Sequence, residues 1–184
     1  MLLPPAFAAV TRALQQLVKT AVPTSTEVTA LGLAEAAGSS HASRVNLFLY
    51  RITSDAALRN QRTARVSKTV TPALELRYLL TAYENPTRAI GQTEEDLLWT
   101  SLNVMYATPH VAVPALGRDV AVRIEPENLT IADVAALWQS ARTEIRATLA
   151  YVVHLPPLLP LEIPASATLE DIRNLRLDRL GGTA

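Results

Sequence analysis

The sequence predicts an α/β (α+β) domain: a mixed, mainly antiparallel sheet of about 4–5 strands flanked by helices, with an extended C-terminal arm. Three observations carry this prediction. Several segments alternate apolar residues with a period of two, as strands do. Others repeat apolar residues every three or four positions behind a capping hydroxyl, as helices do. Finally, prolines crowd residues 156–164 and force an extended path that cannot join a central strand.

The N-terminal part predicts one helix and one weak strand. Over residues 6–21, apolar side chains recur at steps of three and four, which is typical of an amphipathic helix. Pro23 marks the end of this helix. A weak strand is expected over residues 26–31, and residues 38–41 are expected to form a loop.

Two segments in the middle of the chain predict the centre of the sheet. The clearest strand is residues 45–52, with Val45, Leu47 and Leu49 on one side and Phe48, Tyr50 and Ile52 on the other. Apolar side chains on both sides indicate a central strand covered on both faces. Residues 74–82 also alternate and are interpreted as a strand, although their leucines would suit a helix as well.

Two capped helices and two strands are expected in the second half. Thr93 and Thr130 each stand before acidic residues, a pattern typical of helix N-termini. Strands are expected over residues 120–124 and 149–155. The two tryptophans fall in the predicted helices, so both are expected to pack in the core; the predicted apolar positions are Leu97, Leu98, Leu102, Met105 and Tyr106 in the first helix and Ile131, Val134, Leu137 and Trp138 in the second.

The chain divides into a domain over residues 1–157 and a proline-led arm over residues 158–184, which can include a short helix beginning near Thr168. A length of 184 residues and a hydrophobic content of 49% suit one folded domain. The formal net charge is +0, which indicates no general attraction to nucleic acid or to an anionic membrane. There is no cysteine, and no run approaches the roughly 18 apolar residues of a membrane span. Assembly in the cytoplasm is expected.

No pattern in the sequence indicates catalysis, a cofactor or a metal. The three histidines, His41, His110 and His154, lie far apart without metal-type spacing, and each is interpreted as an ordinary surface or core residue. The common nucleotide, hydrolase and metalloprotease motifs are missing. The chain is therefore expected not to be an enzyme; turnover that requires His110 or His154 would overturn this.

The segment 55–68 is a local charge anomaly with a net charge of +3, because it contains three arginines and a lysine but only one aspartate. Three interpretations stay open: a solvated loop, a loop that binds an acidic protein surface, or a nucleic-acid contact. The loop has no aromatic residue to stack on bases, which weakens the third interpretation.

The following segments occur in order along the chain: VNLFLYRI, LRNQ, PALELRYLLTAY, the Ile90-Gly91 lead into ATPHVAVPAL, EPENLTIADVAALW and RATLAYVVHL. This ordered set resembles the domain found in cap, or tail-terminator, proteins of contractile injection systems, which are phage-tail-like particles. The resemblance spans about residues 6–157 and departs from the family pattern at residues 143–148 and in the arm.

The resemblance implies a structural, non-enzymatic role. Such a cap is expected to form a homohexameric ring on the end of the inner tube and sheath, to stop polymerisation and to join the two. Its partners would be other copies of itself, the tube protein and the sheath protein, without nucleic acid, in a particle that can be released from the cell. The candidate contact residues are Arg51, Arg59, Asn60, Gln61, Arg62 and Arg65. The alternative is a generic protein- or nucleic-acid-binding module that uses the basic loop 55–68.

Overall fold

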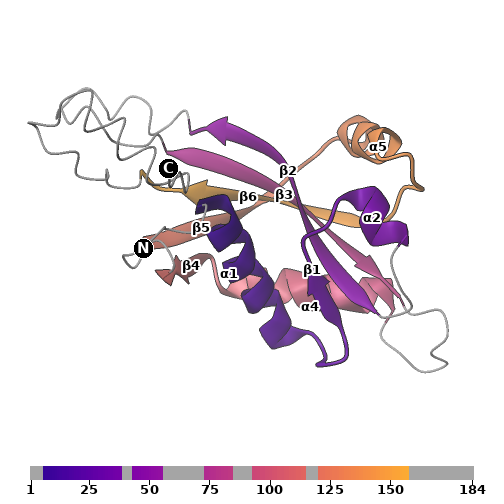
Figure 1. Cartoon of the computed structure of the whole chain (residues 1–184), viewed down its shortest axis with the longest axis horizontal. Coiled ribbons are helices and arrows are strands. Elements are labelled where there is room, and N and C mark those ends of the chain that lie inside the picture. Colours follow the sequence, from indigo (N-terminus) through magenta and orange to yellow (C-terminus); the bar gives the residue numbers. More distant parts are fainter. Residues whose placement is uncertain (1–5, 39–42, 56–72, 85–92, 115–119, 158–184) are drawn as a thin grey trace, which may run out of the picture.

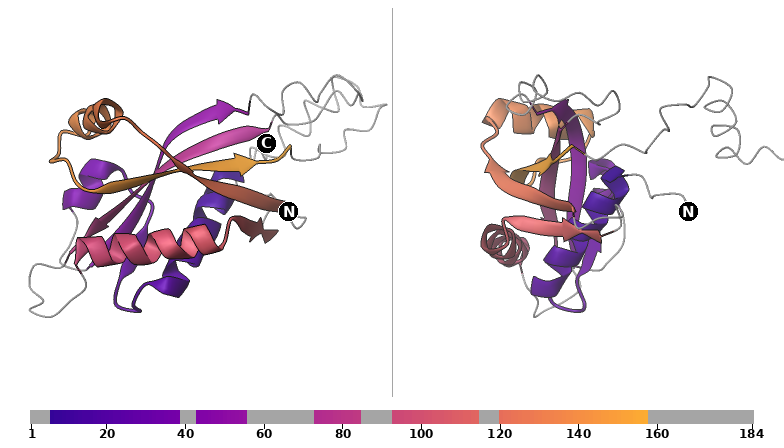
Figure 2. Two further views of the ribbon diagram at one scale, coloured as in Figure 1. Left: turned by 180° about the vertical axis from the view of Figure 1, so that it is seen from behind. Right: turned by 90° about the vertical axis from the view of Figure 1, so that its left-hand side faces the viewer.

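The computed structural model describes residues 6–38, 43–55, 73–84, 93–114 and 120–157. They form one strongly twisted sheet with helices on both of its faces (Figures 1 and 2). The predicted arm and the greater part of the basic loop lie outside the described residues. In chain order the elements are α1 (Ala6–Ala21), β1 (Glu27–Thr29), α2 (Leu33–Gly38), β2 (Arg44–Ser54), β3 (Leu74–Tyr83), α4 (Glu94–Ala107), β4 (His110–Val113), β5 (Val120–Glu127), α5 (Ile131–Ser140) and β6 (Thr148–Leu155).

The strand order across the sheet is β1-β2-β3-β6-β5-β4. Only the β1–β2 pair is parallel; every other neighbouring pair in this sheet is antiparallel. The predicted fold class is therefore confirmed, with six strands in the described part of the chain instead of about 4–5. The sequence analysis missed β4, which lies between Pro109 and Pro114, and an edge strand tolerates such flanking prolines.

The larger core lies between one face of the sheet and helices α1 and α4. Val10, Leu14 and Val18 of α1 are fully buried there, as is Leu97 of α4, and Met105 of α4 is almost fully buried. The sheet contributes side chains from strands β2 to β6, including the phenol rings of the buried tyrosines Tyr78 and Tyr151. These positions follow the alternation in the sequence, so the predicted strands 45–52, 74–82 and 149–155 are confirmed.

A second, smaller core covers part of the opposite face. Leu79 of β3, Leu33 of α2 and Trp138 of α5 are buried in it, and Phe48 and Tyr50 of β2 pack beside them. Helices α2 and α5 both lie near the same end of the sheet (Figures 1 and 2). This face of the sheet is therefore covered at one end by apolar packing, whereas its other end carries polar side chains.

A β-bulge in β2 changes which face its last residues occupy. The register shifts between Leu49 and Arg51, so that Tyr50 is the extra residue. Beyond the bulge, Ile52 pairs with Leu76 of the larger core, and Arg51 pairs with Arg77. The sequence analysis placed Ile52 with Phe48 and Tyr50, which is wrong because strict alternation ends at the bulge. Ile52 is 43% exposed at the rim of the larger core.

In the part of the chain that the structure describes, no helix combines the length and the apolar character needed to cross a membrane.

Candidate functional site

A row of polar residues crosses the end of the sheet that α2 and α5 leave uncovered. Across the sheet, Thr53 of β2 pairs with Glu75 of β3, and Glu75 pairs with His154 of β6. His154 pairs in turn with Arg123 of β5, and Arg123 pairs with His110 of β4. Residues in register on neighbouring strands share a face, so five strands each contribute one member of the row. A polar row on one sheet face indicates a surface rather than a core.

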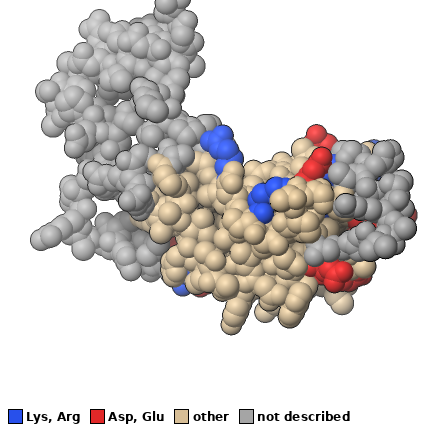
Figure 3. Space-filling model, turned by 90° about the horizontal axis from the view of Figure 1, so that it is seen from below, with Lys and Arg blue, Asp and Glu red and all other residues tan. Residues whose placement is uncertain are grey.

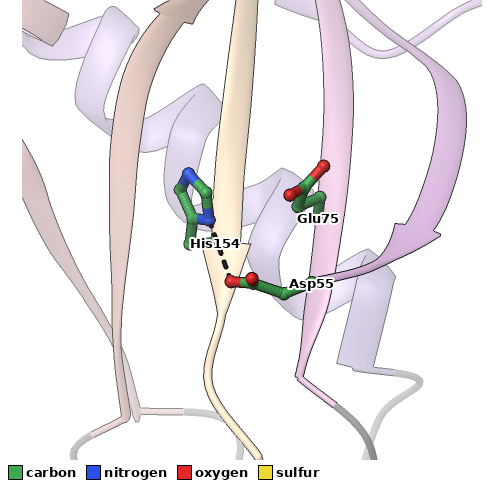
Figure 4. Close-up of side chains that lie close together, drawn as sticks. All are labelled: Asp55, Glu75 and His154. Atoms are coloured by element: carbon green, nitrogen blue, oxygen red, sulfur yellow. Dashed lines mark hydrogen bonds and ion pairs between the residues drawn. The ribbon is translucent and has the colours of Figure 1, made fainter. Parts of the chain in front are cut away.

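At the centre of this row, Asp55, Glu75 and His154 lie close together (Figure 4). Asp55 directly follows β2 and is held beside β3 by a backbone hydrogen bond from its N–H to the carbonyl oxygen of Ala73, at 2.9 Å. The His154 Nδ1 atom lies 3.3 Å from Oδ2 of Asp55, and its Nε2 atom lies 3.1 Å from Oε2 of Glu125. The imidazole is thus placed between two carboxylates from different strands.

Arg77 connects this cluster to the carboxylate of Glu127 on β5. It donates a hydrogen bond of 2.8 Å to Glu75 and pairs on its other side with Glu127. Glu127 also accepts a hydrogen bond of 2.7 Å from the Tyr50 hydroxyl. Burial raises the pKa of Tyr50, so its phenol stays a neutral donor at ordinary pH. The bulged residue therefore joins the polar network to the smaller core.

Of the contact residues predicted from sequence, only Arg51 belongs to the described part of the chain. It is exposed on β2 and lines a groove of about 590 Å³ between β2 and α5, with Tyr50, Glu127 and Asp133 among the other lining residues. The other predicted contact residues lie outside the described residues: Arg59, Asn60, Gln61, Arg62 and Arg65.

The sequence analysis missed the cluster around His154. It treated His154 as an isolated residue, yet two carboxylates lie within hydrogen-bond reach of the ring. One signal was available: Glu75 and His154 are polar residues at positions that alternate with the apolar residues of two predicted strands. Only the pairing of β3 with β6 shows that these two residues lie side by side. His110 is exposed on β4, and His41 lies outside the described residues.

The outer face of α4 is a second candidate surface. Trp99 is 64% exposed and Tyr106 is 78% exposed, so the expectation that both tryptophans pack in the core is confirmed for Trp138 and wrong for Trp99. Helical periodicity places these two residues on one face, and α4 has no charged residue after Asp96. Seen from below, much of this side of the described molecule is uncharged (Figure 3). The result is an aromatic, uncharged helix face.

The two edges of the sheet differ in how they are protected. At the β1 edge, the Gln15 amide of α1 donates to the carbonyl oxygen of Val28 at 3.2 Å, and Lys19 donates to the carbonyl oxygen of Thr26. Among the described residues, no side chain makes a comparable contact to the backbone of β4, so this edge is the more open one.

Comparisons with known proteins agree with this fold. A comparison with individually curated proteins gives no match. The chain is similar to the sheath/tube terminator of PVC, an extracellular contractile injection system, in the extended state: 18% identity, 100% of this chain and 74% of that chain covered, TM-score 0.59. It is also similar to the tube-terminating cap of the anti-feeding prophage: 17% identity, 93% and 67% covered, TM-score 0.60. Both structures come from cryo-EM, and both likenesses show a shared fold.

The sequence itself points to the same group of proteins. The sequence model of one family, described as the Pvc16 N-terminal domain, matches residues 9–169. This match includes the greater part of the chain and extends into the predicted arm, whose boundary at residue 157 stays a prediction. The resemblance to injection-system caps inferred from sequence is thereby confirmed. The chain belongs to the Pvc16 N-terminal domain family.

Proposed function

We propose that this chain is a structural subunit of the cap that ends the tube and sheath of a contractile injection system. The observation that carries the proposal is the family match over residues 9–169, supported by a fold shared with two such caps. The cap is assembled in the cytoplasm, becomes part of a particle that can be released, and performs no catalysis. Its partners are the inner tube protein, the sheath protein and other copies of itself.

The proposed cap is a closed ring of six copies. A closed ring needs two different, complementary surfaces on each subunit. The described residues offer two candidates besides Arg51: the aromatic face of α4 and the open edge of β4. The Arg59–Arg65 loop and the arm stay proposals for further contacts.

The aromatic face of α4 suits a contact with a neighbouring copy of the chain. Trp99 and Tyr106 are among the residue types most enriched in protein–protein interfaces. The lack of charge along the helix after Asp96 suits a surface that is permanently covered, because obligate contacts are more apolar than transient ones. A ring subunit meets this condition, since its neighbours stay in place throughout the life of the particle.

The β4 edge suits the addition of an extended segment. Strand addition forms main-chain hydrogen bonds and needs an edge with free backbone groups. The β1 edge is a poorer acceptor, because Gln15 and Lys19 already bond its carbonyl oxygens. An extended segment from a neighbouring subunit or from the sheath protein would join the sheet beside residues 110–113.

The alternative, a nucleic-acid-binding module, has little support in the described residues. The zero net charge gives no overall attraction to phosphate. On the polar face, Arg77 and Arg123 are paired with Glu75, Glu127 and Glu125. Salt-sensitive binding of the pure protein to DNA or RNA, lost on charge reversal of Arg62 and Arg65, would revive it.

The proposal is tested by the length distribution of the particles produced with and without this chain, measured by electron microscopy. Overlong or ragged tubes and sheaths without the chain are expected, because nothing then stops polymerisation. Restoring the chain on a plasmid should restore the normal length. Particles of unchanged length with intact ends would refute the cap function.

A further inference from the structure

We propose that Asp55, Glu75 and His154 bind one divalent transition-metal ion, which fastens three neighbouring strands at the polar end of the sheet. The three residues come from the end of β2, from β3 and from β6. Glu75 and His154 lie directly opposite each other in the strand register, and the backbone of Asp55 is hydrogen-bonded to Ala73. The fold therefore positions the ligands by main-chain pairing, before any ion is present.

The distances fit a common ion. One potential ligand atom from each residue lies within 4.8 Å of the other two. Ligand atoms about 2.0–2.2 Å from a tetrahedrally coordinated metal lie about 3.4 Å apart. Side-chain rotations that draw the three ligand atoms closer together would place them on one ion. Asp55 is 6% exposed, so the site is sheltered on that side.

Both ring nitrogens of His154 face a carboxylate. A neutral imidazole has one N–H and one lone pair, so it can donate to only one carboxylate. Here the Nε2 atom faces Glu125 at 3.1 Å and the Nδ1 atom faces Asp55 at 3.3 Å. If Nε2–H donates to Glu125, the Nδ1 lone pair faces the Asp55 carboxylate, and a metal ion between them removes the repulsion.

This is the arrangement that metal-binding histidines commonly show. A histidine ligand usually donates its remote ring N–H to a carboxylate, which fixes the tautomer and makes the other nitrogen a better ligand. Glu125 is placed to accept that proton. Glu75 is oriented in turn by hydrogen bonds from the Thr53 hydroxyl at 3.1 Å and from Arg77 at 2.8 Å.

The chemistry of the ligand atoms indicates which ion the site would take. One imidazole nitrogen with two carboxylates suits Zn²⁺ or Mn²⁺ better than Mg²⁺ or Ca²⁺, which prefer oxygen ligands.

The experiment titrates the purified full chain, free of a histidine tag and treated with chelator, with ZnCl₂ at pH 7.5 in a calorimeter. One Zn²⁺ per chain is expected. The melting temperature should rise by about 5 °C at a free Zn²⁺ concentration one hundred times the Kd. Ca²⁺ and Mg²⁺ at the same concentration should change it by less than about 1 °C.

Variants locate the site. His154→Gln and Asp55→Asn should each weaken Zn²⁺ binding at least tenfold. Glu125→Gln should weaken it by about tenfold, because Glu125 acts only by orienting the His154 ring. His110→Gln is the matched control: it lies in the same register row, two strands away from His154, and should bind as the unchanged protein does. Circular dichroism confirms that each variant is folded; if His154→Gln fails to fold, Asp55→Asn and Glu125→Gln carry the test.

Two results would overturn the proposal. One is the lack of stoichiometric Zn²⁺ binding. The other is Zn²⁺ binding that the Asp55, His154 and Glu125 variants leave unchanged. The measurement does not depend on particle assembly, so its outcome is independent of the cap function.

Discussion

Arg44 and Glu27 form an ion pair of 2.9 Å that joins β2 to β1, although the Arg44 side chain is only 3% exposed. Its Nε atom donates to the same Glu27 oxygen at 3.3 Å, and its Nη1 atom donates to the carbonyl oxygen of Ala36 in α2 at 3.1 Å. A single guanidinium thus connects two strands and a helix. Glu27 is 51% exposed, so most of the desolvation falls on the arginine.

Arg44→Ala is expected to lower the free energy of unfolding by about 3 kcal/mol, because it removes buried packing and several charge-assisted hydrogen bonds together. Glu27→Gln should lower it by about 1 kcal/mol, since an amide oxygen still accepts from the guanidinium. Urea denaturation checks both values. Arg51→Ala, on the exposed end of the same strand, is the control and should change the free energy by less than about 0.5 kcal/mol. Equal effects of the two arginine variants would contradict this account.

Thr130 and Thr93 are expected to stabilise the molecule through their helix caps. The Thr130 hydroxyl accepts from the N–H of Asp133 at 3.1 Å, and the N–H of Thr130 donates to the Asp133 carboxylate at 3.2 Å. Thr130→Ala should lower the free energy of unfolding by about 1 kcal/mol, and Thr93→Ala by a similar amount. Thr130→Ser keeps the hydroxyl and should recover most of the loss in chemical denaturation. A serine variant as unstable as the alanine variant would show that the cap is not the cause.

The helices and central strands were predictable because their signals are local. Thr93 and Thr130 stand at the helix N-termini that their capping pattern indicated, and both form complete capping boxes. The strands at residues 45–52, 74–82 and 149–155 were indicated by alternation within each segment, although residues 74–82 would also have suited a helix. In each case the residues that determine the element lie within it, so no knowledge of the fold was needed.

The features that the sequence analysis missed depend on contacts between distant segments. Whether Trp99 is covered depends on which side of α4 meets the sheet, and this helix carries apolar residues on more than one side. The bulge at Tyr50 depends on its pairing with β3. The Asp55–Glu75–His154 cluster joins residues up to 99 positions apart. The charge anomaly of the basic loop 55–68 drew attention instead, because it is visible without a fold.

The buried tyrosines predict a loss of stability at high pH. Burial raises the pKa of Tyr78 to about 12, against the opposing effect of its 2.8 Å hydrogen bond with Thr11, and burial also raises the pKa of Tyr151 to about 12. In the unfolded chain both groups ionise near pH 10. Between pH 10 and 12 the unfolded state therefore releases protons that the folded state keeps. The stabilisation is complete below pH 10 and is lost as the pH rises towards 12.

Each of these tyrosines should contribute a slope of up to about 1.4 kcal/mol per pH unit in that range. The double variant Tyr78→Phe, Tyr151→Phe should therefore lose stability less steeply than the unchanged protein in urea denaturation at pH 9, 10 and 11. Tyr106→Phe is the control, because Tyr106 is 78% exposed on α4, and it should follow the unchanged protein. Parallel curves for the double variant and the unchanged protein would refute the assignment.

Trp99 and Tyr106 are expected to matter for assembly and not for folding. Because both side chains are mostly exposed, Trp99→Ser with Tyr106→Ser should change the melting temperature of the isolated chain by about 2 °C or less. In a strain that lacks the unchanged chain, the same variant should yield overlong particles without caps, since the aromatic contact between neighbouring subunits is lost. Ile131→Ser is the matched control: Ile131 is 86% exposed on α5, which packs against the opposite face of the sheet from α4. If the α4 variant caps particles as efficiently as the Ile131 variant, this helix face is not a subunit contact, and the contact must be sought among the other candidate surfaces.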